Sequence, residues 1–337
     1  MATAALIPGD SVPAGISRRR RGKKWSYCDA SGHAITDPVE IARLNAIGLP
    51  PAYRDCWFNP DPEADLQATG IDARGRKQYR YHPRFRLAQE SRKYDRLRAF
   101  GLALPTLRQR VEAALSGRAI SFERAVASVI RVLDSGALRV GNEQYRRANG
   151  TYGASTLQMR HLRVEGQRIR LRFTAKSGKR RELTLTDRSL LRFVRQMGDL
   201  PGQHLFQYLD DAGQPCPVDS TDINAFIRTE MGEDFTAKDF RTWAASVAVF
   251  EAITSSKKPP SVKEVADLAA ARLDNTPAIA RKSYIHPALL ALTGDEQACL
   301  DLRGQRLPRS TRWLSREERG LLAFLDQAPA ASELLLA

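Results

Sequence analysis

The chain has 337 residues, enough for two domains, and its formal net charge of +15 comes from 53 lysines and arginines against 38 aspartates and glutamates. This excess favours a polyanionic partner, and nucleic acid is a better candidate than a membrane surface, because the sequence has neither an apolar run that could span a bilayer nor a signal-peptide pattern. The four cysteines are widely scattered and form no Cys-x-x-Cys pair, so we expect reduced thiols in a cytoplasmic protein rather than a zinc site.

The N-terminal segment, residues 1–24, is predicted to be a disordered basic arm. It mixes Pro, Gly and Ser with a basic run that begins at Arg18, and it is too polar and too like-charged to fold alone. Contact with a nucleic-acid backbone and a solvated tail of no separate role are equally good interpretations of this arm.

Residues 25–92 are predicted to form a small domain rich in antiparallel strands. Aromatic and β-prone runs are separated there by Pro or Gly turns, and Asp37 is placed to cap a short helix. The expected elements are a helix over 38–47 and strands over 53–58, 66–69 and 78–81. In the last strand Tyr79 and Tyr81 fall on one face, where aromatic residues more often pack a core than bind a ligand.

Residues 93–337 are predicted to form a larger, mainly helical domain. Helical spacing of apolar residues begins at Pro83, and we expect Pro105 to break this stretch into separate helices. Residues 161–185 alternate apolar and basic side chains around two turns, which predicts a small β-hairpin sheet with Lys176 at a hairpin tip. Further helices are expected over 121–138, 187–197, 219–231, 262–272 and 287–337, with Ser121 as an N-cap.

A longer helix is predicted to begin after Thr236. Its buried stripe includes Phe240, Trp243 and Phe250, and Arg241 is expected to lie off that stripe, near the start of the helix. The start of a helix is a favourable place for a phosphate.

Tyr284 follows a short polar turn and lies among basic residues, and we interpret it as a nucleophile. Tyrosine can form covalent intermediates, but its phenol has a pKa near 10 and is almost entirely neutral at pH 7. Attack on a phosphodiester places negative charge on the non-bridging oxygens, and fixed cations stabilise that charge. Polar and basic motifs that could supply this help lie upstream, at 138–142, 173–179, 237–241 and 273–276.

The order of these motifs resembles that of the type IB DNA topoisomerases, in their compact bacterial and poxvirus form. That family has an arginine, a lysine, a second arginine, a histidine or asparagine, and a tyrosine, which here are Arg139, Lys176, Arg241, Asn275 and Tyr284. Ala175 replaces the glycine of the family's Phe-x-Gly-Lys-Ser-Gly-Lys hairpin, and Phe240 replaces the leucine of Lys-Asp-Leu-Arg.

The resemblance implies an α+β fold, in which the N-terminal β-sheet domain precedes a catalytic domain of the tyrosine recombinase and topoisomerase IB type. It places Gln78, Tyr79 and Tyr81 in the major groove of duplex DNA and makes Tyr145 a DNA contact, for which a packing role is the alternative. Lys179 and the arginines that follow it are expected to contact the DNA backbone. The expected protein is a monomer that closes around the duplex as a clamp in the bacterial nucleoid.

The implied reaction is a transesterification in which Tyr284 forms a 3′-phosphotyrosine and frees a 5′-hydroxyl. Resealing needs no ATP, and rotation of the duplex in the interval relaxes supercoils. Arg139 and Arg241 suit a phosphate clamp, Lys176 suits the general acid for the leaving oxygen, and Asn275 suits a neutral hydrogen-bond donor. No metal or cofactor is expected, and the five histidines, which show no metal-ligand spacing, are interpreted as structural.

Two alternatives stay open. A tyrosine site-specific recombinase shares the catalytic fold and the nucleophile, but it usually has His-x-x-Arg at the second arginine, where this chain has Lys238 at the histidine position. A non-enzymatic duplex DNA-binding protein would hold the same residues as surface cations and a packed tyrosine. The order of the motifs and the N-terminal strand domain favour the topoisomerase.

Overall fold

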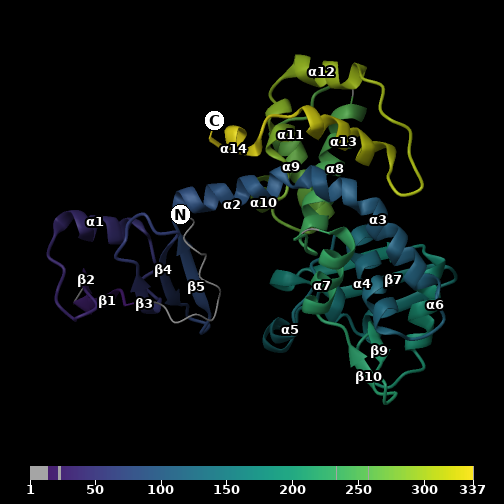
Figure 1. Cartoon of the computed structure of the whole chain (residues 1–337), viewed down its shortest axis with the longest axis horizontal. Helices are drawn as coiled ribbons and strands as arrows, with labels where there is room; N and C mark the ends of the chain where they lie inside the picture. The colour runs from purple at the N-terminus through teal and green to yellow at the C-terminus, as the bar shows by residue number, and fades with distance from the viewer. Residues whose placement is uncertain (1–13, 22–23, 233, 257, 337) are drawn as a thin grey trace. The chain divides into compact units, whose positions relative to one another are not determined.

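The computed structural model in Figure 1 describes residues 14–21, 24–232, 234–256 and 258–336. The chain divides into two compact units, Met1–Arg92 and Lys93–Ala337, which are called here the N-terminal unit and the catalytic unit. The boundary falls inside one helix, α2 (Pro83–Asp95). The α+β class predicted from the sequence is confirmed, because one unit is built on an antiparallel sheet and the other is mainly helical.

The N-terminal unit is a five-stranded antiparallel sheet with strand order β2-β1-β3-β4-β5. The strands are β1 (Ile16–Arg21), β2 (Lys24–Cys28), β3 (Arg54–Phe58), β4 (Leu66–Ile71) and β5 (Lys77–Tyr81). Helix α1 (Pro38–Ala46) begins after Asp37, whose carboxylate accepts from two backbone N–H groups, as predicted. Its Leu44 packs with Tyr27 and Phe58 in the core of this unit. The strand order places β5 at one edge of the sheet.

The prediction of a disordered arm over residues 1–24 is wrong for 16–21 and for Lys24, which are strand residues, while 1–13 lie outside the described residues. Arg18 shows why a like-charged run can fold here. Its guanidinium donates to the carbonyls of Leu49 and Pro50 at 2.8 and 2.9 Å and lies 4.2 Å from the ring centroid of Trp25. These contacts and the pairing of β1 with both β2 and β3 offset the repulsion between neighbouring arginines.

The catalytic unit surrounds one large core, to which α3, α4 and α8 contribute most of their buried faces. In Figure 1, α11, α12 and α13 lie beside α8 at one end of this unit. Its principal helices are α3 (Leu97–Ser116), α4 (Phe122–Gly136), α5 (Glu143–Asn149), α6 (Arg188–Met197), α7 (Ser220–Met231), α8 (Asp239–Ser255), α9 (Val262–Leu273), α10 (Pro277–Ser283), α11 (Pro287–Leu292), α12 (Glu296–Gly304), α13 (Arg316–Gln327) and α14 (Ala331–Leu336).

The predicted hairpin sheet is present as β6 (Leu162–Glu165), β7 (Arg168–Thr174) and β8 (Arg180–Leu185), in that order. A second hairpin pairs β9 (Gln207–Leu209) with β10 (Pro215–Pro217) before α7. The short helix α5 lies between Arg139 and this sheet in the chain. These strands and short helices leave the turn between β7 and β8 beside the ends of α4 and α9.

Pro105 does not break the helix as predicted, because α3 continues through it and the break falls at Arg96, between α2 and α3. A proline inside a helix costs about 3 kcal/mol through its missing N–H and a clash with the preceding turn. Leu104 and Leu107 are fully buried beside it, and burying such side chains contributes about 1.5–3 kcal/mol each. The apolar face of α3 therefore outweighs the proline.

The start of α8 also differs from the prediction. The helix begins at Asp239, and Thr236 lies in the turn before it. The carboxylate of Asp239 accepts from the backbone N–H and the hydroxyl of Thr236, at 2.8 and 3.0 Å. This local contact holds the turn that precedes the helix, and the helix itself carries Arg241 in its first turn.

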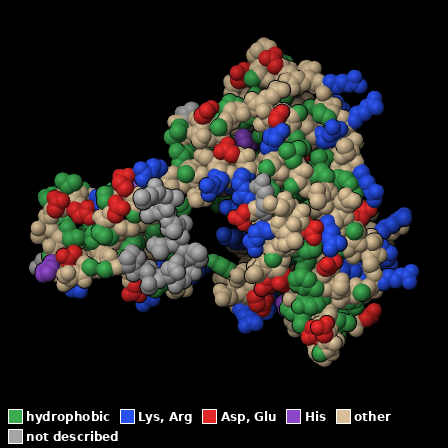
Figure 2. All heavy atoms as spheres, in the orientation of Figure 1, with side chains coloured by type: hydrophobic (Ala, Val, Ile, Leu, Met, Phe, Trp, Pro, Cys, Tyr) green, Lys and Arg blue, Asp and Glu red, His purple; other side chains and the backbone are tan. Residues whose placement is uncertain are grey.

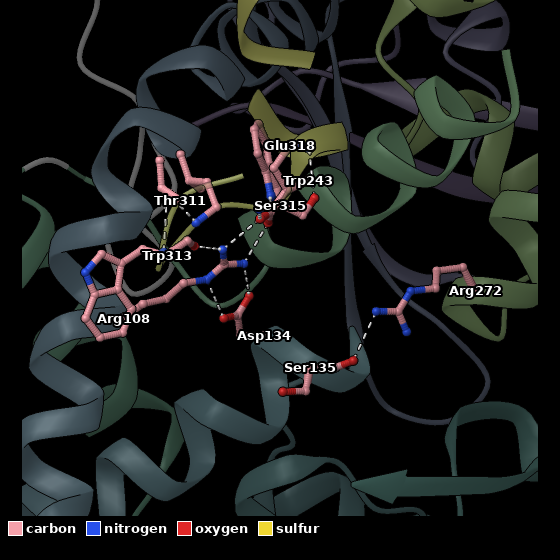
Figure 3. Close-up of polar contacts among 10 residues, drawn as sticks. Arg108, Asp134, Ser135, Trp243, Arg272, Thr311, Trp313, Ser315 and Glu318 are labelled. Atoms are coloured by element: carbon pink, nitrogen blue, oxygen red, sulfur yellow. Dashed lines mark hydrogen bonds and ion pairs between the residues drawn. The ribbon is translucent and has the colours of Figure 1, made fainter. Parts of the chain in front are cut away.

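A largely buried ion-pair network joins four helices of the catalytic unit (Figure 3). Arg108 of α3 pairs with Asp134 of α4 at 2.8 Å and with Glu318 of α13 at 2.7 Å. Glu318 also accepts from the indole N–H of Trp243 on α8, at 2.9 Å. Asp134 lies in the last turn of α4 and Trp243 in the first turns of α8, so the network fixes the two helices that lead to Arg139 and Arg241.

Candidate active site

The ends of α4 and α9 lead directly into two of the predicted catalytic residues. Each helix ends in a residue with left-handed backbone, Ala137 with φ 49° and Asp274 with φ 53°. Arg139 follows the first of these caps and Asn275 the second. A left-handed non-glycine residue costs about 1–2 kcal/mol, so the abrupt end of each helix depends on contacts made by its neighbours.

Three arginines supply such contacts by donating to the free carbonyls of these helix ends. Arg272 donates to Ser135 O at 3.0 Å, as Figure 3 shows. Arg181 of β8 donates to Gly136 O at 3.2 Å and to Arg272 O at 3.1 Å. Carbonyls in the last turn of a helix have no partner within it and carry the negative end of its dipole, so cations there are stabilising.

Arg241 makes the next contact in the series, with Ala137 O at 2.5 Å and Leu273 O at 2.9 Å. The series ends where Arg139 donates to the side-chain oxygen of Asn275. We call these contacts between the two helix ends the helix-end ladder. They bring the predicted Arg139, Arg241 and Asn275 together, although these residues lie far apart in the sequence.

Asn275 is 8% exposed, and its amide orientation follows from the ladder. Because Arg139 can only donate, the atom of Asn275 that faces it is Oδ1, and Nδ2 is left as a donor. That Nδ2 has no hydrogen-bond partner among the described residues. A buried donor without a partner carries a free-energy cost that an incoming phosphate oxygen would remove.

Arg241 is 3% exposed, so the prediction that it lies off the buried face of α8 is wrong. The carbonyls of Ala137 and Leu273 explain how a cation can be buried there, because they accept from its two terminal nitrogens, while its Nε has no partner among the described residues. Its guanidinium carbon lies 5.0 Å from the ring centroid of Tyr284. Burial, with repulsion from Arg139, lowers the pKa of Arg241 to about 10, so this side chain is still charged at neutral pH.

Tyr284 is half-buried against these cations. Burial raises the pKa of its phenol, but Arg241, by charge and hydrogen bonding, and then Arg139 and Lys238 lower it, and the balance lies below the ordinary value of 10.0. A lowered pKa increases the phenolate fraction at neutral pH. The site therefore favours the nucleophilic form of this tyrosine.

The tyrosine segment is held from behind by hydrogen bonds to its backbone. Tyr284 ends α10, a helix that Thr276 begins as N-cap. The carbonyl of Tyr284 accepts from the hydroxyl of Ser246 on α8 at 3.4 Å, and the carbonyl of Lys282 accepts from the phenol of Tyr94 at 3.2 Å. These contacts fix the backbone while leaving the Tyr284 side chain facing Arg241.

Lys176 lies in the turn between β7 and β8, as predicted. The turn is a short 3-10 segment, η3 (Lys176–Gly178), in which Ser177 has a φ of 66°. Lys176 is exposed, and it lines a small pocket together with Arg139, Arg181 and Arg241. The three predicted cations thus face one space beside Asn275 and Tyr284.

The three residues predicted to contact the DNA backbone, 179–181, differ in their surroundings. Lys179 lies at the site, with Nζ 3.3 Å from Asn275 O and 3.8 Å from a carboxylate oxygen of Asp274. Arg181 belongs to the helix-end ladder, where its guanidinium donates to protein carbonyls. Its sequence signal was the alternation of β8, which turns Arg181 inward while Arg180 faces solvent.

The predicted DNA contacts of the N-terminal unit lie on β5, the edge strand of its sheet. Tyr79 and Tyr81 stack with ring centroids 6.3 Å apart, and Tyr81 stacks on Phe85 at 5.2 Å. Gln78 donates to a carboxylate oxygen of Asp72 at 3.0 Å. Neither tyrosine belongs to the core of this unit, which argues against the packing interpretation.

In the catalytic unit, the predicted DNA contact Tyr145 lies on α5 and is 52% exposed. Charge alone does not mark the site, because Figure 2 shows lysine and arginine side chains projecting along a whole edge of this unit.

Among the described residues, no group of three or more His, Cys, Asp or Glu side chains could hold a metal ion. No helix of the described ranges is long and apolar enough to cross a membrane.

Comparison with known proteins gives two family matches and two relatives. Residues 82–281 match the catalytic core of eukaryotic DNA topoisomerase I, and residues 24–72 match the N-terminal domain of bacterial DNA topoisomerase IB. The chain is 31% identical over 285 residues to DNA topoisomerase 1B of Acanthamoeba polyphaga mimivirus, which covers 80% of this chain and 85% of the relative. DNA topoisomerase 1 of Mycosarcoma maydis is 25% identical over 181 residues, 48% of this chain and 18% of that protein.

Proposed function

The chain belongs to the type IB DNA topoisomerases, which cleave one strand of duplex DNA through a phosphotyrosine intermediate, and we propose that Tyr284 is its nucleophile. The observation that carries this assignment is the position of the Tyr284 ring against Arg241, a member of the helix-end ladder. The family matches do not favour a site-specific recombinase or a non-enzymatic DNA-binding protein.

In the proposed cleavage step, the phenolate oxygen of Tyr284 attacks the scissile phosphorus. A bond forms between this oxygen and phosphorus, and the bond from phosphorus to the 5′-oxygen breaks. The product is a 3′-phosphotyrosine and a 5′-oxygen, which takes a proton from the ammonium group of Lys176. Lys176 suits this role because it is exposed at a hairpin tip and lines the pocket.

Arg139, Arg241 and Asn275 are proposed to stabilise the charge that develops on the non-bridging oxygens. Arginine offers paired planar donors and stays charged, and Asn275 has an unused Nδ2 beside Arg139. Religation is the same step in reverse, with the 5′-hydroxyl as nucleophile and Tyr284 as leaving group. One phosphoester replaces another, so the step needs no external energy source, and DNA torsion supplies the drive for relaxation.

We further propose that the N-terminal unit, which includes β1 as well as residues 25–92, acts as a DNA clamp and that 93–337 is the catalytic domain, in a monomeric protein associated with the bacterial nucleoid. Tyr79 and Tyr81 of β5 support a groove contact, because neither belongs to the core of the sheet. Gln78 and Lys179 are proposed contacts in the same complex, and so is Tyr145, which is exposed on α5.

The assignment is tested by trapping the covalent intermediate. A duplex with a nick just beyond the cleavage site loses its short leaving strand, and mass spectrometry of the digested adduct then identifies the residue that holds the DNA. We expect the 3′-phosphate on Tyr284, formed equally in EDTA and without nucleotide. Tyr284→Phe should form no adduct while binding the same duplex. DNA attached at another residue would refute the assignment.

A further inference from the structure

Arg181 lies at a position in the helix-end ladder that the reaction described above does not use. Its side chain comes from β8, and its Nη2 donates to Gly136 O at 3.2 Å and to Arg272 O at 3.1 Å. Gly136 belongs to the last turn of α4, and Arg272 to the last turn of α9. A single nitrogen therefore joins the two helices just before they end.

The two carbonyls have matching places relative to the site. Gly136 precedes Arg139 by the same number of residues as Arg272 precedes Asn275. Arg241 then joins the next carbonyl of each helix, at Ala137 and Leu273, and the side chains of Arg139 and Asn275 meet directly. Arg181 thus bridges α4 and α9 one residue earlier in each helix than Arg241 does.

The electrostatics of the helix ends require such a bridge. Each helix end carries roughly half a negative charge on its free carbonyls. Two such ends side by side repel each other unless a cation lies between them. Burial, with Arg272 and Arg139 nearby, lowers the pKa of Arg181, and Asp274 opposes this shift. The two carbonyls and Asp274 stabilise the charged guanidinium against its burial and against repulsion from Arg272 and Arg139.

We propose that Arg181 is a positioning residue, which fixes the distance between Arg139 and Asn275 by joining the ends of α4 and α9. The proposal rests on the proposed function, since those two residues matter here as phosphate donors. Arg181 also lines the pocket, so direct contact with DNA phosphate is the competing role. The two roles predict different losses, one in the rate of cleavage and the other in affinity.

The test measures single-turnover cleavage at saturating enzyme, together with duplex affinity, for Arg181→Ala and Arg181→Lys. We expect a rate about 10–100-fold lower for both, because small displacements of positioning groups have effects of this size. Lysine keeps the charge, but its side chain is one atom shorter, so we expect its ammonium group to fall short of the position that bridges both carbonyls. Affinity should stay within about twofold of the parent enzyme.

A double-mutant cycle with Asn275→Ala shows whether Arg181 acts through the Arg139–Asn275 pair. In the Asn275→Ala background we expect Arg181→Ala to lower the rate by less than about threefold, since the distance it sets no longer matters. Effects that simply multiply would overturn the proposal, and so would a fall in affinity with a shallower salt dependence, which would mark a phosphate contact.

Arg172→Ala is the matched control, because it removes an arginine from the same small sheet. Arg172 pairs with Glu182 at the exposed surface, at 2.9 Å, and we expect its loss to leave rate and affinity unchanged. Thermal unfolding identifies any variant that fails to fold, and Arg181→Lys then carries the test. Wild-type rates in folded Arg181 variants overturn this inference alone, whereas an adduct on a residue other than Tyr284 overturns the proposed function.

Discussion

The edge strand β5 and the helix-end ladder are both proposed to meet DNA, but their side chains are held in different ways. Tyr81 is 38% exposed, and its ring stacks on Tyr79 and Phe85. Arg241 is 3% exposed and donates to carbonyls from two helices. Stacked rings can slide and adapt to a groove, whereas bridged guanidiniums cannot. The first region therefore suits affinity and the second suits catalytic geometry.

The largest expected effect comes from the ladder. Arg241→Ala should lower the single-turnover cleavage rate by about a thousandfold or more, because it removes a phosphate donor and also a bridge between the helix ends. Duplex affinity should change little, since Arg241 is buried among protein carbonyls. Filter binding and rapid-quench cleavage measure the two quantities. A parallel loss of affinity and rate would break the comparison between the regions.

The network behind the ladder should show the next effect, in stability. Arg108→Met leaves the carboxylates of Asp134 and Glu318 buried without their cation, which costs about 3–5 kcal/mol. Denaturant unfolding of the catalytic unit measures this loss. Arg110→Ala on the same helix removes only partly exposed pairs, with Glu123 and Glu230, and should cost about 1 kcal/mol or less. Equal losses for both variants would show that burial of the network is unimportant.

Acid should destabilise the catalytic unit before the N-terminal unit. Burial lowers the pKa of His286, next to the tyrosine segment, to about 4, with Lys93 adding to the shift and Asp95 and the Tyr94 backbone opposing it. The unfolded chain then binds a proton that the folded chain does not, so stability is full above pH ~6.5 and falls as the pH drops toward 4. The loss for this one group is on the order of 3 kcal/mol.

In the N-terminal unit, by contrast, the side chain of His33 is 82% exposed. Unfolding followed by limited proteolysis between pH 7 and 4 should therefore show the catalytic unit lost first. His286→Asn keeps a residue that can cap α11, whose N-cap is His286, and should flatten this dependence. Loss of the N-terminal unit first would contradict the assignment.

The smallest effect is expected at β5. Tyr81→Ala should weaken duplex binding by about fivefold, or ~1 kcal/mol, the size typical of one aromatic contact. The salt dependence should be unchanged because no charge is removed. At saturating enzyme the cleavage rate should equal that of the parent. A slower rate at saturation would show that β5 takes part in assembling the site, which would blur the distinction between the two regions.

Local signals in the sequence predicted much of the fold. Asp37 and Ser121 cap their helices as expected, because an N-cap needs only a short side chain and the next turn. The fate of Pro105 and of the arginine run at Arg18 could not be predicted in this way. Both depend on partners distant in the chain, such as the core around α3 and the carbonyl of Leu49.

The candidate site shows the same limit. The order of motifs was enough to select Arg139, Lys176, Arg241 and their partners, and the structure brings them together. The burial of Arg241 and the bridging role of Arg181 were missed. Charge normally predicts exposure, and nothing in the sequence shows that two helices end side by side with free carbonyls.

One consequence of the ladder concerns how the enzyme could be altered. Arg241 holds the scaffold together and also faces the tyrosine, so any change there alters both at once, and selection cannot tune one without the other. Lys176, on an exposed turn between two strands, does not also hold the helix ends together. A variant designed to change the lifetime of the covalent intermediate is therefore best sought in the hairpin that carries Lys176.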